Sequence, residues 1–397
     1  MTTLTSGTSL RVPHADGTVT THTARARSYV FDLPFDGTAP VTRSVFAAAH
    51  VVANPFTDPA DFGSPQSIDW DATLAFRRHV WGLGLGVADA MDTAQRGGGL
   101  GWRLARDLIR RSGAEAHSVG GSVAFGAMTD QLEPGQMHSL ERIVDAYVEQ
   151  VGWIGEAGGV PVLMASRHLA LAASSSDDYL RVYGDVIRQS PVPVFLHWLG
   201  VTFDPSLKGY WGSDDLDIAA DTFIALVEAN QQKISGAKIS LLDAKREVDL
   251  RRRLPSGVHM HTGDDFNYAE LIAGDEYGHS DALLGAFDAL AVPARAALAR
   301  LDDGDTAGFH QILDPTVALS RHVFATPTSA YKTGIVLLAW LNGHQDHFRM
   351  VASAETWRSV PHLAETFVLA DAAGALADPE LATHRMRQFL EVAGVVQ

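Results

Sequence analysis

The stretch ISGAKI, residues 234–239, is a short apolar segment that carries one charged side chain, Lys238. A second segment of the same kind, VHMHT at residues 258–262, follows it and runs into GDD at residues 263–265. We interpret both as buried strands, because short apolar runs bounded by polar residues are typical of strands covered on both faces. Burial disfavours a charged amine, so a lysine at the end of an inner strand is expected to have a pKa lowered toward neutrality. Such an amine can attack a ketone and form a Schiff base; the alternative is a lysine whose ammonium group simply reaches solvent.

The rest of the chain alternates strand-like apolar runs with amphipathic helical stretches, which is typical of βα units around a parallel sheet. We predict eight strands, at residues 44–49, 87–91, 122–127, 160–165, 192–197, 234–238, 258–262 and within 278–285. We predict helices at residues 71–80, 140–154, 179–187, 217–229, 294–301, 309–324, 331–341 and 357–376. Eight strands separated by helices favour an α/β fold of the closed (β/α)₈ TIM-barrel type. A doubly wound sheet is the alternative, because strand and helix patterns do not by themselves show closure.

The predicted domains follow from this pattern. Residues 1–40 form an N-terminal extension with a hairpin turn at Ala15-Asp16-Gly17. Residues 41–290 form the barrel, and residues 291–397 form a C-terminal helical segment that packs against one side of it.

Composition excludes several classes of function. The chain has 397 residues, of which 46% are hydrophobic, and its formal net charge is −16. So acidic a protein repels nucleic acid and anionic membranes, and we expect neither as a partner. The absence of cysteine excludes disulfides, thiolate nucleophiles and cysteine-ligated metal sites. No signal peptide or membrane-spanning stretch is evident, so we expect a cytoplasmic protein.

A set of short motifs occurs in a characteristic order along residues 44–341. They are Asn54-Pro55-Phe56, Ile68-Asp69-Trp70, Pro193-Val194-Phe195-Leu196-His197, Gly236-Ala237-Lys238, Thr262-Gly263-Asp264-Asp265 and Tyr331-Lys332. In these motifs the chain resembles the dihydrodipicolinate synthase / N-acetylneuraminate lyase superfamily, and most of all a divergent branch of unknown function. The resemblance implies a TIM barrel, class I aldolase chemistry with Lys238 as the Schiff-base residue, and a homo-oligomer.

The chain departs from the family at two places. Where the family has Gly-Thr-Thr-Gly-Glu after the second strand, this chain has MDTAQ at residues 91–95, which retains Thr93 and introduces Asp92. A negative charge at Asp92 would repel the carboxylate of a pyruvate-type substrate. The tyrosine that ends the family's fifth strand is replaced by His197. The resemblance therefore implies lysine chemistry without implying pyruvate as the substrate.

The remaining candidate residues lie at the ends of predicted strands. We expect His197 and Thr93 to move protons, because an imidazole titrates near neutrality and a hydroxyl can relay a proton. We expect Asp92 and His261 to bind substrate hydroxyl groups, and Asp265 to contact substrate unless it caps the following helix as Asp264 can. Arg167 is a candidate for binding an acidic group, or for pairing with a surface carboxylate. The glycine-rich stretch at residues 95–99 is interpreted as a lid or a plain loop.

Two alternatives stay open. His259 and His261 lie on the same face of one strand, and with His50 and Asp265 they could bind zinc or manganese in a metal-dependent hydrolase or isomerase. The chain could also be a catalytically degenerate barrel that binds a metabolite. The favoured hypothesis is a Schiff-base-forming lyase, aldolase or dehydratase, with no metal or other cofactor. Its substrate would be a small-molecule carbonyl compound, either a keto acid or a sugar-derived ketone.

Overall fold

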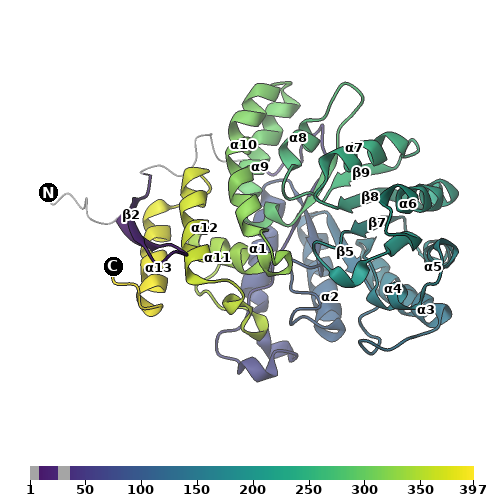
Figure 1. The fold of residues 1–397 in the computed structure, drawn as a ribbon, viewed down its shortest axis with the longest axis horizontal. Helices are drawn as coiled ribbons and strands as arrows, with labels where there is room; N and C mark the ends of the chain where they lie inside the picture. The colour runs from purple at the N-terminus through teal and green to yellow at the C-terminus, as the bar shows by residue number, and fades with distance from the viewer. Residues whose placement is uncertain (1–8, 26–35) are drawn as a thin grey trace.

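The computed structural model describes residues 9–25 and 36–397, and at its centre lies a closed barrel of parallel strands (Figure 1). The strands are β3 (Val45–Ala48), β4 (Gly86–Asp89), β5 (Val123–Ala127), β6 (Val160–Leu163), β7 (Val194–Leu199), β8 (Ile234–Ser240), β9 (His259–Thr262) and β10 (Asp281–Leu284). They follow one another around the barrel in chain order, and β10 pairs with both β9 and β3. The predicted (β/α)₈ barrel is confirmed, and the doubly wound alternative is wrong because the sheet closes.

Side chains alternate between the inside of the barrel and its helix-covered outside, as the two-residue period of a strand requires. The inside holds an apolar cluster made of Phe46, Ala48, Ala88, Met91, Ala124, Val162, Met164, Phe195 and Leu283. In β8, Ala237 and Ile239 belong to the larger core between strands and helices. Lys238 lies between these two residues in the strand and therefore points to the inside.

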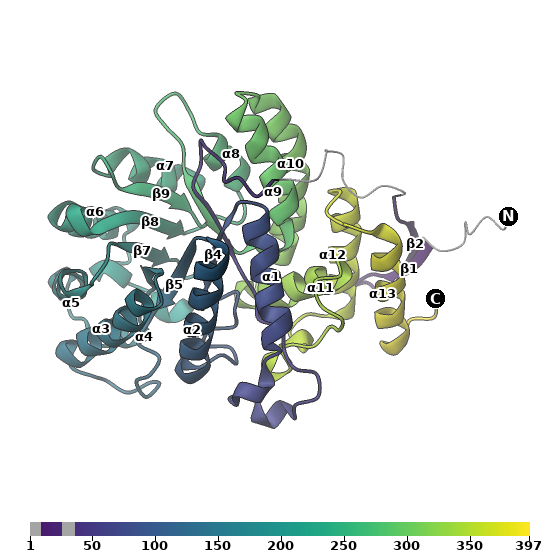
Figure 2. The ribbon, with the colours of Figure 1, turned by 180° about the vertical axis from the view of Figure 1, so that it is seen from behind.

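A ring of helices covers the barrel, and further helices extend it on one side (Figures 1 and 2). They are α1 (Trp70–Gly82), α2 (Trp102–Val119), α3 (Leu140–Glu156), α4 (Arg167–Ala172), α5 (Ser176–Gln189), α6 (Leu216–Asn230), α7 (Ala244–Arg253), α8 (Tyr268–Ala273), α9 (Ala286–Asp302), α10 (Thr306–Val323), α11 (Tyr331–Leu341), α12 (Val360–Ala372) and α13 (Pro379–Val392). Helix α5 starts where the serine and aspartate cluster predicts, with a capping box between Ser175 and Asp178. Helices α2, α4, α7, α8 and α13 lie outside the predicted set.

The two described ends of the chain pack together beside the barrel (Figure 1). Strands β1 (Ser9–Pro13) and β2 (Val19–Thr23) form the predicted hairpin, and Gly17 in its turn has a φ of +84°. The hairpin is joined to the C-terminal helices through a hydrogen bond of 2.9 Å between His22 Nε2 and Asp371 Oδ2 on α12. The rest of the predicted N-terminal extension, at residues 1–8 and 26–35, lies outside the described residues. In the part of the chain that is described, no helix is long and apolar enough to cross a bilayer.

A buried ion pair holds the carboxyl end of β4. Arg77 on α1 donates two hydrogen bonds to Asp89, of 3.0 and 2.8 Å, and Ser112 on α2 donates a third of 2.6 Å. Both charged side chains are fully buried. The arrangement fixes the point at which residues 90–95 leave the barrel, and so it positions Asp92 and Thr93.

Replacement of Arg77 by methionine is expected to lower the free energy of unfolding by about 3–5 kcal/mol, because Asp89 would keep a buried charge without a partner. The neighbouring Arg78, which is 46% exposed and pairs with Glu115, provides a matched control. Arg78→Met is expected to change the free energy of unfolding by less than about 1 kcal/mol. Urea denaturation of both variants measures the two values, and similar losses in both would contradict a special role for the buried pair.

Candidate active site

Lys238 lies near the carboxyl end of β8, between His197 on β7 and His261 on β9, which are its register partners. Its side chain is 8% exposed and faces the inside of the barrel. Gly263 is the first residue after β9, and because it has no side chain it provides the space that the Lys238 side chain occupies. A Cβ atom at this position would lie 2.7 Å from Lys238 Cε and would also clash with Ser240 Oγ. The glycine in the GDD sequence is therefore a steric requirement of the buried lysine.

The charge of Lys238 is set by burial and by two carboxylates. Burial lowers the pKa of Lys238, while the nearby Asp265 and Asp92 oppose that shift. Asp265 follows β9, and its Oδ1 atom accepts a 2.8 Å hydrogen bond from the backbone N–H of Ala286 at the start of α9. Burial raises the pKa of Asp265 to about 7. Lowering the pKa of the amine and raising that of the carboxyl group brings the two values closer together, which favours proton exchange between them, as acid–base catalysis requires.

His197 is buried beside the amine. Its Nε2 atom lies 3.0 Å from Ser240 Oγ, and its Nδ1 atom has no hydrogen-bond partner among the described residues. Burial, and to a lesser extent the charge of Lys238, holds the pKa of His197 well below its ordinary value. The imidazole is therefore neutral around pH 7, and a neutral imidazole can accept a proton or relay one. The predicted proton-transfer role of His197 stays a prediction.

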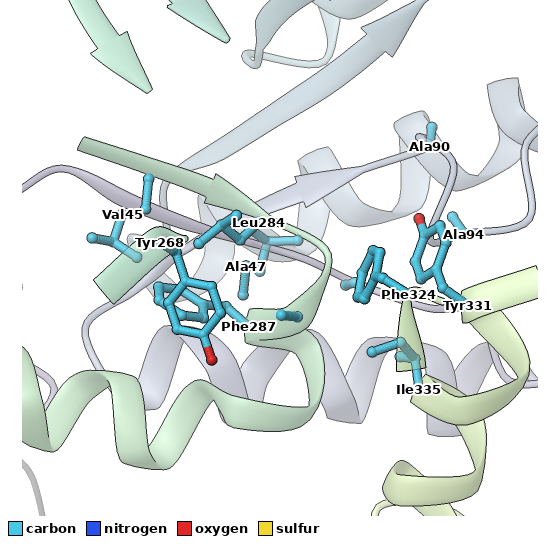
Figure 3. Packing of buried hydrophobic residues seen from close by; sticks show 14 of the residues in the cluster. Val45, Ala47, Ala90, Ala94, Tyr268, Leu284, Phe287, Phe324, Tyr331 and Ile335 are labelled. Carbon is cyan, nitrogen blue, oxygen red and sulfur yellow. The ribbon is translucent and has the colours of Figure 1, made fainter. Parts of the chain in front are cut away.

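Thr93 is paired with a tyrosine from the C-terminal segment. Its Oγ1 atom lies 2.9 Å from the hydroxyl group of Tyr331, the first residue of α11. Tyr331 stacks on Phe324 with ring centroids 4.2 Å apart, and Figure 3 shows the two rings side by side near Ala94. Burial holds the pKa of Tyr331 well above its ordinary value. The sequence analysis assigned no role to Tyr331, because no sequence pattern indicates that a residue of α11 contacts the segment after β4.

The segment that carries Asp92 and Thr93 has an unusual backbone. Ala90 and Gln95 adopt φ angles of +51° and +62°, a left-handed region that residues with a side chain rarely occupy. Such outliers persist only where the surrounding structure holds them, and they cluster at functional sites. Here the Gln95 amide exchanges hydrogen bonds of 2.9 and 3.2 Å with the backbone of Val351. The glycine-rich stretch at residues 95–99 is thus joined to the C-terminal segment through Gln95.

A cavity of about 250 Å³ lies over the carboxyl ends of β4 to β7. Its lining is Asp92, Arg96, Gly97, Gly98, Met128, Met164, Ala165, Arg167, Leu199, Phe203, Asp204, Leu207, Ser329, Tyr331, Lys332 and Trp357. Lys238 is not one of the lining residues. Asp92, which does line the cavity, interacts electrostatically with both Lys238 and Lys332 and opposes the lowering of their pKa by burial.

Lys332 is a second buried lysine, and it was not among the predicted site residues. Its side chain is 6% exposed, and its Nζ atom donates a 3.2 Å hydrogen bond to the carbonyl oxygen of Ser329. The Nζ atom also lies 4.7 Å from the ring centroid of Tyr331. Burial lowers the pKa of Lys332, and Asp92 opposes that shift. A lysine at the start of an otherwise apolar helix is the signal that could have identified it.

Arg167 is at the rim of the cavity. It begins α4, its side chain is 66% exposed, and its Nε atom lies 2.6 Å from Asp204 Oδ2. Asp264 has a structural role, because its Oδ1 atom accepts hydrogen bonds from the backbone N–H groups of Phe266 and Asn267. The interpretation that one carboxylate of the GDD sequence caps the next helix is wrong, because the N-cap of α8 is Asn267 and Asp264 binds the turn that precedes the helix.

His261 is not part of the cavity lining. It packs inside the barrel with its ring centroid 4.6 Å from that of Phe195, and burial lowers its pKa to about 4. Its Nε2 atom has no hydrogen-bond partner among the described residues. The structure therefore brings Lys238, His197, Thr93, Asp92 and Asp265 to one region, with Arg167 at the cavity rim and His261 deeper in the barrel.

The three histidines of the metal-site alternative do not converge. His50 pairs with Asp288 on α9 at 2.7 Å, while His259 is 66% exposed at the amino end of β9 and pairs with Asp281 at 3.2 Å. Within residues 9–25 and 36–397, no group of three or more His, Asp or Glu side chains is arranged to hold a metal ion. The geometry gives the metal-dependent alternative no support.

Replacement of Gly263 by alanine is expected to displace the Lys238 side chain and to lower the free energy of unfolding by about 1–3 kcal/mol, because the added methyl group overpacks the site. Reductive methylation with formaldehyde and cyanoborohydride, followed by peptide mass analysis, should show altered labelling of Lys238. Gly184→Ala is the control, since a Cβ atom on this α5 residue meets no atom within 4 Å. Unchanged labelling and stability in Gly263→Ala would contradict the steric role.

The same labelling reaction measures the protonation of Lys238. Because burial lowers its pKa, labelling of Lys238 should rise with pH at a midpoint below the ordinary lysine value of 10.5. Asp265→Asn should move the midpoint further down, since the opposing carboxylate is removed. The exposed Lys245 in the same digest serves as the reference for reagent reactivity. A midpoint at or above 10.5 would show that burial does not lower the pKa of Lys238.

Comparison with known proteins agrees with this architecture. The profile of the family described as Protein of unknown function (DUF993) matches residues 10–395, and no curated protein matches the chain. Dihydrodipicolinate synthases from Aquifex aeolicus, Bacteroides thetaiotaomicron and Oceanobacillus iheyensis have similar structures, with TM-scores of 0.58, 0.57 and 0.55 at 14%, 15% and 14% identity. These similarities cover 89%, 78% and 75% of this chain and 98%, 92% and 86% of the other chains. The fold is therefore that of the dihydrodipicolinate synthases, as the motifs predict, and the chain belongs to the DUF993 family.

Proposed function

We propose that the protein is a Schiff-base-forming lyase of the class I aldolase type that acts on a small keto acid or sugar-derived ketone. The observation that carries the proposal is the buried amine of Lys238 at the carboxyl end of β8, where TIM-barrel active sites lie. The protein shares its fold with dihydrodipicolinate synthases, and this similarity supports class I aldolase chemistry. The room left by Gly263 and the carboxyl group of Asp265 beside the amine support Lys238 rather than another lysine.

The groups around Lys238 suit each step of this chemistry. The neutral amine adds to the substrate carbonyl carbon, and the resulting hydroxyl group leaves as water when a proton is supplied. Asp265, with its pKa raised to about 7, can supply that proton and later take one back. The protonated imine then accepts the electron pair of a neighbouring C–C or C–O bond as that bond breaks.

Other side chains hold or move the remaining protons. The hydroxyl pair of Thr93 and Tyr331 can pass a proton between substrate and solvent, and neutral His197 can accept one. Asp92 is proposed to bind substrate hydroxyl groups, and Arg167 to bind an acidic group at the rim. His261 lies outside the cavity lining, and its contact with substrate hydroxyl groups stays a prediction.

A trapping experiment tests the nucleophile. The chain contains five lysines, at positions 208, 233, 238, 245 and 332, so one digest resolves them all. Borohydride reduction in the presence of a panel of keto acids and keto sugars is expected to leave an adduct on Lys238. Lys238→Met should abolish both the adduct and turnover, a loss of at least about 10³-fold for an activated nucleophile that forms the covalent intermediate.

Lys332→Met is the matched control, because it removes the other buried lysine near the cavity while leaving Lys238 in place. This variant should still form the adduct on Lys238, although its affinity for the carbonyl compound can change. An adduct found only on Lys332, or full turnover by Lys238→Met, would overturn the proposed role of Lys238.

A further inference from the structure

The cations around the cavity are matched by carboxylates of the chain itself. Arg96 forms an ion pair of 2.6 Å with Asp130, and Arg167 forms one of 2.6 Å with Asp204. Lys332 lines the cavity together with Asp92, whose carboxylate interacts with it electrostatically. Lys238 in turn has Asp265 and Asp92 beside it. Among the described residues that line the cavity, no cation is left without a carboxylate to face it.

The carbonyl-binding end of the site is especially rich in acceptors. Asp92 and Asp265 interact electrostatically with the amine of Lys238 from two different elements, the segment after β4 and the segment after β9. A substrate carboxylate attached directly to the carbonyl carbon would have to lie among these groups and would be repelled. A hydroxyl group in the same place could donate a hydrogen bond to Asp92, which is the more favourable arrangement.

We infer that the substrate is a hydroxyketone whose carbonyl carbon carries a hydroxymethyl or hydroxymethylene group, and not an α-keto acid. The inference rests on the proposed function, because it assumes that Lys238 is the residue that binds the carbonyl carbon. Asp92 then selects the substrate through the hydroxyl group next to that carbon. Lys332 lines the same cavity as Asp92 and can offer further hydrogen-bond donors to the substrate.

The reaction balances without another reactant. The Lys238 amine and the ketone form an imine and release water. A base removes the proton from the hydroxyl group on the carbon β to the imine carbon, the bond between the α and β carbons breaks, and an aldehyde departs as the electrons reach the imine. The enamine carbon takes up a proton, and water then releases the shortened hydroxyketone and restores the amine.

The remaining walls of the cavity fit such a molecule. Met128, Met164, Leu199, Phe203 and Leu207 form apolar walls, and Trp357 at the mouth is 40% exposed. An indole ring can pack against the C–H face of a polyol while its polar groups face Asp92 and Lys332. The volume of about 250 Å³ suits a compact carbohydrate-sized ligand better than a large cofactor.

The experiment compares two probes of equal carbon number, dihydroxyacetone and pyruvate, each incubated with the full-length protein and cyanoborohydride. Peptide mass analysis then quantifies the adduct on Lys238. The wild-type protein is expected to favour dihydroxyacetone by about tenfold or more, the size of effect that one nearby unit charge produces. Asp92→Asn should bring the ratio of the two adducts toward one, because the repelling charge is removed.

Asp185→Asn is the control, since Asp185 is a carboxylate on α5 that pairs with Arg188 and does not line the cavity. This variant should keep the wild-type preference. If the wild-type protein forms the pyruvate adduct on Lys238 as readily as the other, the substrate class is wrong while the Schiff-base function stands. If neither probe labels Lys238, the proposed function fails and this inference fails with it. Should Asp92→Asn not fold, the wild-type ratio alone decides.

Discussion

The burial of one amine inside a closed barrel is the constraint on which the proposed chemistry depends. Lys238 is 8% exposed, and its side chain fits only because Gly263 has no Cβ atom. Loss of hydration lowers the pKa of the amine, and Asp265 and Asp92 limit that shift. The position of Lys238 on β8, the absence of a side chain at Gly263 and the two carboxylates therefore act together to set the pKa and the accessibility of the amine.

The C-terminal segment is part of this site as well as a cover for the barrel. Tyr331 reaches Thr93, Lys332 faces Asp92 across the cavity lining, and the backbone of Val351 holds Gln95. These contacts join α11 and the residues after it to the strained segment that follows β4. The buried pair of Arg77 and Asp89 holds the other end of that segment. The candidate active site is thus built between the barrel and the C-terminal helices.

The polar groups around Lys238 are the basis of our inference that the substrate is not an α-keto acid. Solved dihydrodipicolinate synthases are 14–15% identical to this chain, and this similarity shows a shared fold and not a shared substrate. In this chain the amine is flanked by carboxylates, and the cations near the cavity have partners of their own. The histidines that suggested a metal site are separated by the barrel itself, since His259 lies at its amino end while His50 pairs with Asp288.

Local pattern was sufficient to predict all eight barrel strands, the hairpin and the position of Lys238, because burial and alternation leave a periodic trace in a sequence. It also identified Asp92, Thr93, His197 and Asp265 as strand-end residues. It did not show that Tyr331 and Lys332 join them, since contacts between residues 93 and 331 depend on how helices pack and leave no local trace. It also named His261 as a substrate-contacting residue, which stays a prediction, and the ring of His261 packs against that of Phe195. The sequence alone thus determined the barrel and the strand that carries its amine, whereas packing between distant segments decided which groups surround that amine and what charge they present.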